Sequence, residues 1–412
     1  MDRHMTNRLP ILFILITVMI DAMGIGLIMP VMPKLIQQVE GGDIGNAAIW
    51  GGVLSTSFAM MQFLFSPLLG RLSDAFGRRP VLLVSLLVMA ADYLVMAVAG
   101  SIWVLVAGRI VGGITAATHS TANAYMADIS ASKDKAANFG LIGAGFGVGF
   151  VFGPMLGGLL AEYGTRAPFY AAAALALTNA LFGMVVLRET VTDATRRPFR
   201  LSGANPFSAF RSLSALNSTS GPVAPLLWVV FLYHLANVVY PAVWAYFTIA
   251  RFGWSPGVIG ISLAVYGVSM VVVQGGLIRP AIRMFGDRRT VIIGLGIEVI
   301  ALALVALLSN GWLVMALIPI SALGAIGLPA LQGILSHAAP DDAQGELQGV
   351  LSSIASVSMI IGPILMTQVF ALFTSDHAPF HLPGAPFLLA SALMALGWAV
   401  FATCQRPQGR YA

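Results

Sequence analysis

Apolar stretches of about 20 residues or more alternate with short polar segments along most of the chain. A segment that crosses lipid must pair its own backbone polar groups, which leaves helices or closed barrels. The stretches do not alternate apolar and polar residues as barrel strands do. The pattern therefore predicts an all-α membrane protein whose twelve spans lie at residues 9–37, 48–72, 79–100, 102–127, 136–162, 167–187, 222–250, 256–282, 289–309, 311–337, 346–373 and 384–404.

One polar segment, residues 188–221, is much longer than the others and interrupts the series after the sixth span. It contains five arginines together with prolines and other turn-forming residues, a composition typical of a linker. The expected organisation is an N-terminal six-helix half over residues 1–188, a cytoplasmic central loop over 189–221 and a C-terminal six-helix half over 222–412.

The two halves resemble each other when the sequence is shifted by 209 residues. The matching pairs include Gly51 and Gly260, Gly77 and Gly286, Arg79 and Arg288, Trp103 and Trp312, and Gly153-Pro154 and Gly362-Pro363. Parallel repeats of six spans are the plan of a large class of secondary transporters, whose substrate site lies between the halves. The repeat therefore favours a transporter.

Composition and charge support a membrane location and give an orientation. Hydrophobic residues make up 58% of the chain and charged residues only 9%, against about 25% charged in soluble domains. Of the 22 lysines and arginines, 18 lie on the side of the spans that holds the N-terminal tail and the central loop. By the positive-inside rule both termini are expected in the cytoplasm. The single cysteine, Cys404, excludes an internal disulfide, and the net charge of +5 resides in loops and is no sign of nucleic-acid binding.

The N-terminus is short and basic, and it continues directly into an apolar stretch from Leu9. This arrangement imitates a signal peptide, but the stretch is too long and has no small-residue cleavage site. We therefore expect it to be the first span.

Four ionisable residues lie deep within spans: Asp21, Asp92, Arg109 and Glu298. Charges in hydrocarbon are unfavourable, and those that occur usually face the bundle interior and mark ion or substrate pathways. A proton carrier needs a carboxylate whose proton affinity differs between buried and water-exposed states. We expect Asp21 to carry the proton, with Arg109 holding it ionised in one state. The alternative is a buried ion pair that only fixes helix packing.

Polar residues along several spans are candidates for a substrate cavity. At helical spacing Ala116, Ser120 and Asn123 follow the face of Arg109, and His119 is adjacent. In the second half His234 shares a face with Pro241, Ala245 and Thr248. The candidate substrate-binding residues are Asp21, Asp92, His119, Ser120, Asn123, His234, Asn237, Trp244, Tyr266 and Gln274. A helix–helix contact of small residues and hydrogen-bonded structural histidines are the alternative interpretation.

Two motifs are candidates for gating. The loop Gly70–Pro80 places Asp74 among three arginines, and Asp128 at the end of the fourth span is the expected partner of Arg78. The fifth span carries glycines four residues apart and the pair Gly153-Pro154, which allow close helix packing and a bend.

These motifs resemble those of the major facilitator superfamily. The loop Gly70–Pro80 is similar to the superfamily's loop motif, and Gly149–Gly158 is similar to the fifth-helix motif of its drug/proton antiporters. Closer likeness is to bacterial tetracycline/metal–proton antiporters, and it rests on residues 21–33, 76–83, 251–254, 328–333 and 347–349. The likeness is weakest in the central loop and after residue 370.

The resemblance implies roles for individual residues. Asp21 and Asp92 would be the essential carboxylates for substrate and proton, with Arg109 and Gln274 as further polar residues of the spans. Ser73, Asp74 and Arg78 would form the cytoplasmic gate loop. The full set of gating candidates adds Gly70 in the same loop, Asp128 at the end of span four and Gly153-Pro154 in span five. The family exports a metal–tetracycline chelate in exchange for a proton.

The sequence departs from the family where the cavity is expected. The family aspartate of span nine aligns with Val299, one residue after Glu298, and its span-eight histidine aligns with Met270. A shift of one residue turns a helix by about 100°. Span four has Thr115-Ala-Ala-Thr-His119 in place of the family's Thr-Gly-Ala-Thr-Gly.

The expected function is a proton-coupled efflux antiporter for a small amphipathic drug, most readily one like tetracycline. The alternatives are export of another drug, metabolite or sugar, and an uncoupled facilitator. An enzyme is not expected, because the chain has no metalloprotease, nucleophile-elbow or phosphate-loop motif. We expect no cofactor and no metal held by the protein itself, although the substrate is a candidate Mg²⁺ chelate. The expected partners are protons, a small-molecule substrate and the bilayer, and the expected functional form is a monomer of the bacterial cytoplasmic membrane.

Overall fold

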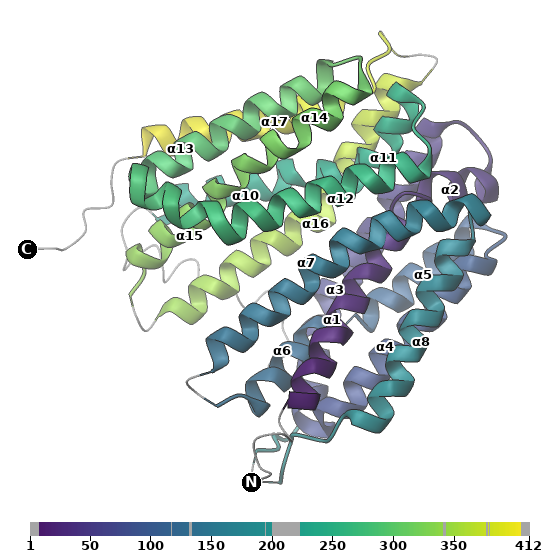
Figure 1. Ribbon diagram of the computed structural model, residues 1–412, viewed down its shortest axis with the longest axis vertical. Helices are drawn as coiled ribbons and strands as arrows, with labels where there is room; N and C mark the ends of the chain where they lie inside the picture. Colours follow the sequence, from purple (N-terminus) through teal and green to yellow (C-terminus); the bar gives the residue numbers. More distant parts are fainter. Residues whose placement is uncertain are drawn as a thin grey trace, which may run out of the picture. The chain divides into compact units, whose positions relative to one another are not determined.

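The described part of the chain is helical and contains no strand in the computed structural model (Figure 1). The structure describes residues 8–116, 118–131, 134–193, 195–199, 223–340, 343–375, 378 and 380–404. The helices of the first half are α1 Arg8–Ile28, α2 Met32–Glu40, α3 Ile44–Phe76, α4 Arg78–Val98, α5 Ile102–Ile114, α6 Thr118–Ile129, α7 Lys135–Leu160, the 3₁₀ turn η1 Ala161–Tyr163 and α8 Ala167–Val186. Those of the second half are α10 Val223–Asn237, α11 Val239–Phe252, α12 Pro256–Val272, the π turn η3 Val273–Leu277, α13 Ile278–Leu307, α14 Gly311–Ala322, the 3₁₀ turn η4 Leu323–Ile326, α15 Gly327–Ala338, α16 Gln344–Thr374 and α17 Ala385–Thr403.

The predicted membrane architecture is confirmed. Within the described residues, eleven helical stretches are long and apolar enough to cross a membrane. One of them, Pro256–Leu307, runs for 52 residues and contains the eighth and ninth predicted spans. Gly286 separates these two spans, because its φ of 74° interrupts the helix there. The chain is therefore a multi-pass membrane protein.

Several predicted spans are not continuous helices. The first is broken at Met29–Val31, where Pro30 and Pro33 remove backbone donors, so that α1 and α2 share it. The fourth is interrupted after Ile114. There the Thr115 hydroxyl donates to the carbonyls of Val111 and Gly112, and such back-bonding bends helices. The predicted polar stripe from Arg109 to Ser120 and Asn123 is therefore wrong as one continuous helical face.

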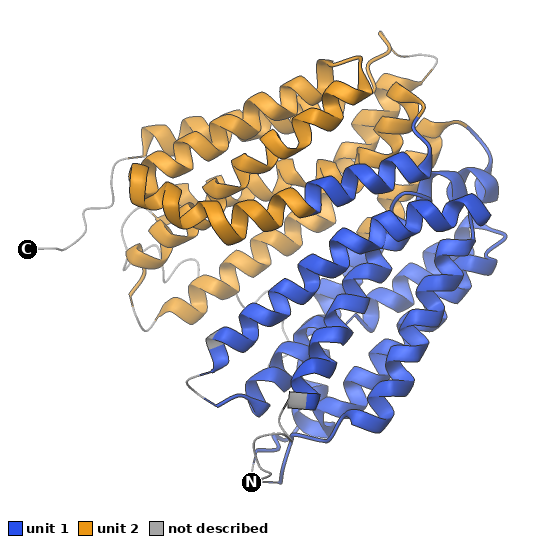
Figure 2. Cartoon of the chain, viewed as in Figure 1, with its two compact units in different colours: residues 1–42, 57–206, 254–267 blue, residues 43–56, 207–253, 268–412 orange. Residues whose placement is uncertain are grey.

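The chain forms two compact units (Figure 2). Unit 1 comprises residues 1–42, 57–206 and 254–267, and unit 2 comprises residues 43–56, 207–253 and 268–412. Each unit thus includes one helical segment from the opposite half of the sequence: the start of α12 in unit 1 and the start of α3 in unit 2. The boundaries predicted at residues 188 and 222 stay a prediction.

A ladder of glycines on α7 sets the packing of α1 in unit 1. An added Cβ at Gly149, Gly153 or Gly157 would lie 2.1, 2.6 or 2.1 Å from the carbonyl oxygens of Met19, Met23 and Leu27 in turn. Both sets of residues recur every four positions, so the two helices run parallel with matched periods. Small residues of this kind allow backbones to approach closely in lipid.

The start of α12 packs in unit 1 against the bend of α7. A Cβ at Gly260 would lie 2.3 Å from the carbonyl oxygen of Pro154. In unit 2 the start of α3 meets the repeat-related bend of α16, where a Cβ at Gly52 would lie 3.2 Å from the carbonyl oxygen of Pro363. The Thr56 hydroxyl also donates to the Ile360 carbonyl of α16 (2.8 Å). A glycine of α12 and a glycine of α3 thus each lie close to a proline carbonyl, and these two prolines, Pro154 and Pro363, are related by the internal repeat.

Replacing Gly149 by alanine should lower the thermal unfolding midpoint of the detergent-solubilised protein, because overpacking costs about 1–3 kcal/mol. The matched control is Gly143→Ala on the same helix, where an added Cβ meets no atom within 4 Å. Alanine there should leave the midpoint unchanged or raise it, since alanine favours a helix over glycine by about 0.8–1 kcal/mol. Equal midpoints for the two variants would contradict the packing described.

Candidate functional site

The central feature of unit 1 is an ion pair between Asp92 on α4 and Arg109 on α5. Nη2 of Arg109 donates to Oδ2 of Asp92, and the carboxylate side chain is only 3% exposed. The guanidinium also lies over the ring of Phe58 on α3, with its central carbon 4.9 Å from the ring centroid. Cation–π contacts of this kind add to the stability of a desolvated cation.

Two glycines of α5 make room for this carboxylate. A Cβ at Gly108 would lie 2.8 Å from Oδ1 of Asp92, and one at Gly112 would lie 2.7 Å from Oδ2. The carboxylate therefore lies directly against the α5 backbone, at two glycines that precede and follow Arg109 in the sequence. The Oδ1 atom of Asp92 and the Nε of Arg109 are both buried without a hydrogen-bond partner among the described residues. The pair is tight, yet each member keeps an unused polar atom.

In this structure Arg109 pairs with Asp92, which lies against the glycine face of α5. The expected role of Arg109 in holding Asp21 ionised in one state stays a prediction. Asp21 is half-buried on α1, between the Met19 and Met23 carbonyls that contact α7. Within the described part of the chain no cation pairs with it. A Cβ at Gly24, one turn further along α1, would lie 2.7 Å from the hydroxyl oxygen of Tyr93 on α4.

Glu298 is buried in unit 2, where its side chain lies against the 3₁₀ turn η4. A Cβ at Gly324 would lie 2.4 Å from Cγ and 3.1 Å from Oε1 of Glu298. The residue is 3% exposed, whereas its neighbour Val299 is half-buried. The side chain thus points between α13 and η4, and its part in proton coupling stays a prediction.

The other candidate substrate residues of unit 1 lie on α6 and α12. His119 is exposed, and its ring meets that of Phe146 on α7 edge to face at 5.9 Å. Ser120 is also exposed, and Asn123 is half-buried, as is Tyr266 at the unit 1 end of α12. These four side chains of α6 and α12 are thus exposed or half-buried, and their role in binding substrate stays a prediction.

The candidates of unit 2 are more dispersed. Along the predicted face of α11 the exposure of the side chains differs: Thr248 is fully buried with its hydroxyl bonded to the Trp244 carbonyl, while Pro241 is exposed. Trp244 itself is buried against Phe387 (6.0 Å between ring centroids). The remaining candidates are half-buried His234 and Asn237, and Gln274, which is exposed in η3. A π turn often marks a functional position, which distinguishes Gln274.

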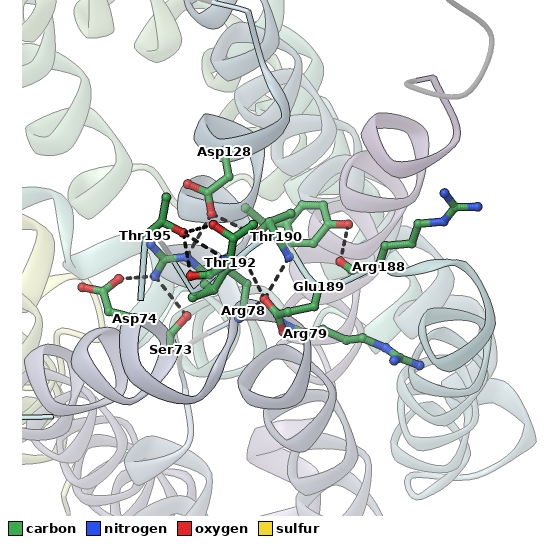
Figure 3. A network of polar contacts seen from close by, with 12 residues as sticks. Ser73, Asp74, Arg78, Arg79, Asp128, Arg188, Glu189, Thr190, Thr192 and Thr195 are labelled. Carbon is green, nitrogen blue, oxygen red and sulfur yellow. Dashed lines mark hydrogen bonds and ion pairs between the residues drawn. The ribbon is translucent and has the colours of Figure 1, made fainter. Parts of the chain in front are cut away.

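Arg78 is the centre of a polar network at the end of α3 and the start of α4 (Figure 3). Its Nη1 pairs with Asp74 (2.5 Å) and its Nε pairs with Asp128 on α6 (3.2 Å). The buried hydroxyl of Ser73 accepts a further bond from Nη1 (3.2 Å). The predicted partnership of Arg78 and Asp128 is therefore confirmed, although no contact reaches Gly70, whose Cβ position is open to 4 Å.

Sequence analysis missed a residue that contacts the same loop. The carboxylate of Glu189, just after α8, accepts hydrogen bonds from the backbone N–H groups of Arg78 (2.9 Å) and Arg79 (3.2 Å). The one hint in the sequence was the glycine at position 77, where the structure has a φ of 114°. Among the described residues, no group of three side chains with metal-ligating atoms lies together.

Comparison with known proteins identifies the family. Residues 14–278 and 226–409 match the family model for the Major Facilitator Superfamily. The chain belongs to the Major Facilitator Superfamily. The class C tetracycline resistance protein of Escherichia coli is 43% identical over 371 residues, which cover 90% of this chain and 92% of that protein. The class H protein of Pasteurella multocida is 37% identical over 396 residues, covering 95% and 94%.

A more distant relative and two solved structures extend the comparison. Multidrug resistance protein 2 of Bacillus subtilis is 30% identical over 400 residues, covering 95% of this chain and 96% of that protein. A nucleoside transporter has a TM-score of 0.77 at 13% identity, covering 95% of this chain and 98% of that one. A D-xylose–proton symporter has a TM-score of 0.74 at 15% identity, covering 98% and 99%. The two solved structures show that the fold is the same. The match to the Major Facilitator Superfamily and the tetracycline resistance proteins shows that the chain is a transporter and not an enzyme.

Removing one member of the Asp92–Arg109 pair should destabilise the protein by about 3–5 kcal/mol, because the other charge stays buried without a partner. Asp92→Asn and Arg109→Gln should therefore each lower the thermal unfolding midpoint in detergent. The double variant should lose clearly less than the sum of the two, as coupled residues do. Strictly additive losses would show that the two side chains do not interact in the folded protein.

Proposed function

We propose that this protein is a proton-coupled efflux antiporter that exports tetracycline-like drugs. The observation that carries the proposal is the 43% identity with a tetracycline resistance protein over nine-tenths of the chain, in a protein that keeps carboxylates within its spans. A transporter without ion coupling has no need for such residues, which are unfavourable in lipid.

Asp21 is proposed as the residue that exchanges its proton. It is half-buried without a cation partner among the described residues, so its ionised form receives little local stabilisation. Asp92 pairs with Arg109, and its buried Oδ1 has no hydrogen-bond partner among the described residues. We propose that substrate competes for these carboxylates and that the inward proton gradient shifts the population between inward- and outward-facing states.

The proposed location is the bacterial cytoplasmic membrane, with both termini in the cytoplasm. The bias of 18 among 22 basic residues toward one side supports this orientation. Some of those residues, Arg3, Lys133, Arg200, Arg211, Arg406 and Arg410, lie outside the described part of the chain. We propose that the monomer is the functional form, because one chain contains both six-helix repeats.

The proposed substrate is a tetracycline carried as its Mg²⁺ chelate, in which the metal is part of the cargo. A cationic chelate would be attracted by Asp21, a carboxylate with no cation partner among the described residues. The second candidate is a different amphipathic drug. It is favoured by Val299 and Met270, which replace polar residues of the tetracycline antiporters, and by the likeness to a multidrug resistance protein.

Everted membrane vesicles with an acidic, positive interior should accumulate labelled tetracycline in the presence of Mg²⁺, and a protonophore should abolish the accumulation. Asp21→Asn should reduce it by at least tenfold, because an amide cannot release a proton. The matched control is Glu40→Gln, since Glu40 is an exposed carboxylate at the end of α2.

Proton-driven uptake that persists in Asp21→Asn would overturn the role given to Asp21. No uptake by folded wild-type protein would overturn tetracycline as the substrate. The same vesicles would then be screened for proton release on addition of other amphipathic drugs, which tests the second candidate.

A further inference from the structure

The start of the central loop makes close contacts with the gate loop of unit 1. We call residues Arg188–Arg197 the strap. The backbone N–H of Arg197 donates to the Asp74 carbonyl (3.3 Å), and the Tyr125 hydroxyl on α6 donates to the Arg188 carbonyl (2.9 Å). These two contacts attach the strap to the end of α3 and to α6. Figure 3 labels Arg188, Glu189, Thr190, Thr192 and Thr195 of the strap beside Arg78 and Asp128.

The carboxylate of Glu189 lies at the N-terminus of α4, where it accepts hydrogen bonds from the helix backbone. The first N–H groups of a helix have no partner within it, and a carboxylate there is favoured by hydrogen bonding and by the helix dipole. Gly77, the N-cap residue of α4, has no side chain with which to cap. Glu189 supplies that cap from 110 residues further along the chain, through the amides of Arg78 and Arg79. Its Oε1 also accepts from its own strap, from the amides of Thr190 and Val191 (both 2.9 Å).

The positive φ of Gly77 belongs to the same arrangement. A Cβ at this position would lie 2.2 Å from Oε2 of Glu189, so only glycine admits the carboxylate. The repeat-related Gly286 has a similar φ of 74°, but a Cβ there meets nothing within 4 Å among the described residues. The arginine two residues after this glycine makes the same kind of contact in both halves. Arg79 donates to the Met184 carbonyl (2.7 Å), and Arg288 donates to the Ala402 carbonyl (3.0 Å).

The strap also shares an acceptor with the gate. The Thr190 hydroxyl donates to Oδ2 of Asp128 (2.9 Å), the same oxygen that pairs with Nε of Arg78 (3.2 Å). A movement that separates Arg78 from Asp128 must therefore also strain the strap, because Glu189 binds the backbone of Arg78 while Thr190 binds Asp128. In the second half the position that corresponds to Arg78 holds Asp287. The contacts of Arg78 with Asp74 and Asp128 therefore have no counterpart there.

We propose that Glu189 is a positioning residue of the cytoplasmic gate, through which the start of the central loop holds Arg78 against Asp74 and Asp128. Glu189 touches no residue proposed to bind substrate or proton, so it acts through Arg78. The transport consequence rests on the proposed function, whereas the capping of α4 does not.

The first test is amide hydrogen exchange of the purified full chain, which needs no substrate. Because the amides of Arg78 and Arg79 have no partner within α4, Glu189→Ala should raise their exchange rates about five- to tenfold, as expected for loss of a helix cap. The control is Glu346→Gln, an exposed carboxylate in the first turn of α16, which should leave these amides unchanged. Unchanged exchange in Glu189→Ala would overturn the proposal.

The second test is transport in everted vesicles with labelled tetracycline and Mg²⁺. Glu189→Ala should lower the maximal rate about five- to tenfold, the scale of a lost cap, and leave KM within about twofold. Glu189→Gln, which keeps one accepting oxygen, should be intermediate. The unfolding midpoint and the folded fraction of each variant are measured beside those of Glu346→Gln, so that the rate is compared per folded molecule. A maximal rate equal to wild type, or one reduced only in proportion to the folded fraction, would overturn the gating role.

Gly77→Ala and Gly286→Ala complete the design, since both place a Cβ at positive φ but only the first displaces Glu189. Gly77→Ala should reduce the maximal rate more than Gly286→Ala does, and this difference should vanish when Glu189→Ala is also present. A difference that persists without Glu189 would contradict the proposal. If wild type fails to move tetracycline while Glu189→Ala still loses amide protection, the substrate is wrong and the capping stands.

Discussion

A charged side chain in hydrocarbon is stable only where other polar groups replace the water that it has lost, and this constraint governs where charges lie in the protein. Asp92 meets it by lying against the α5 backbone at Gly108 and Gly112, which brings it to Arg109. Glu298 occupies the space left by a glycine at position 324. In both cases the absent side chain of a glycine, rather than the charge itself, decides which neighbour the carboxylate meets.

The same small residues fix the register of the helices that carry the candidate site. Lipid is as apolar as the helix surfaces, so helices associate through close packing and not through the hydrophobic effect. On α1 the carbonyls of Met19 and Met23 each lie against a glycine of α7, and Asp21 lies between them. The glycine ladder of α7, which runs from Gly149 through Gly153 to Gly157, therefore sets the height of α1 in unit 1, and with it the height of Asp21.

Hydropathy predicted the spans because lipid requires each spanning helix, taken by itself, to have about 20 predominantly apolar residues. A short loop likewise allowed the partnership of Arg78 and Asp128 to be predicted from opposite charge at adjacent span ends. The pairing of Arg109 with Asp92 was not predicted, because it depends on which face of α5 carries the glycines that admit a carboxylate. Glu189 escaped prediction for a related reason: it is an exposed residue 110 positions from the helix that it caps, and its contacts are with backbone, which carries no signal in the sequence.

The internal repeat shows that the Asp92–Arg109 pair is not needed for packing. Shifted by 209 residues, these positions become Ala301 on α13 and Ile318 on α14, which are 2% and 4% exposed. The second half therefore packs the same two positions with apolar side chains. Replacing a buried ion pair by well-packed apolar residues is often neutral or stabilising. The ion pair is therefore not a general requirement of the six-helix repeat, which agrees with the coupling role proposed for Asp92.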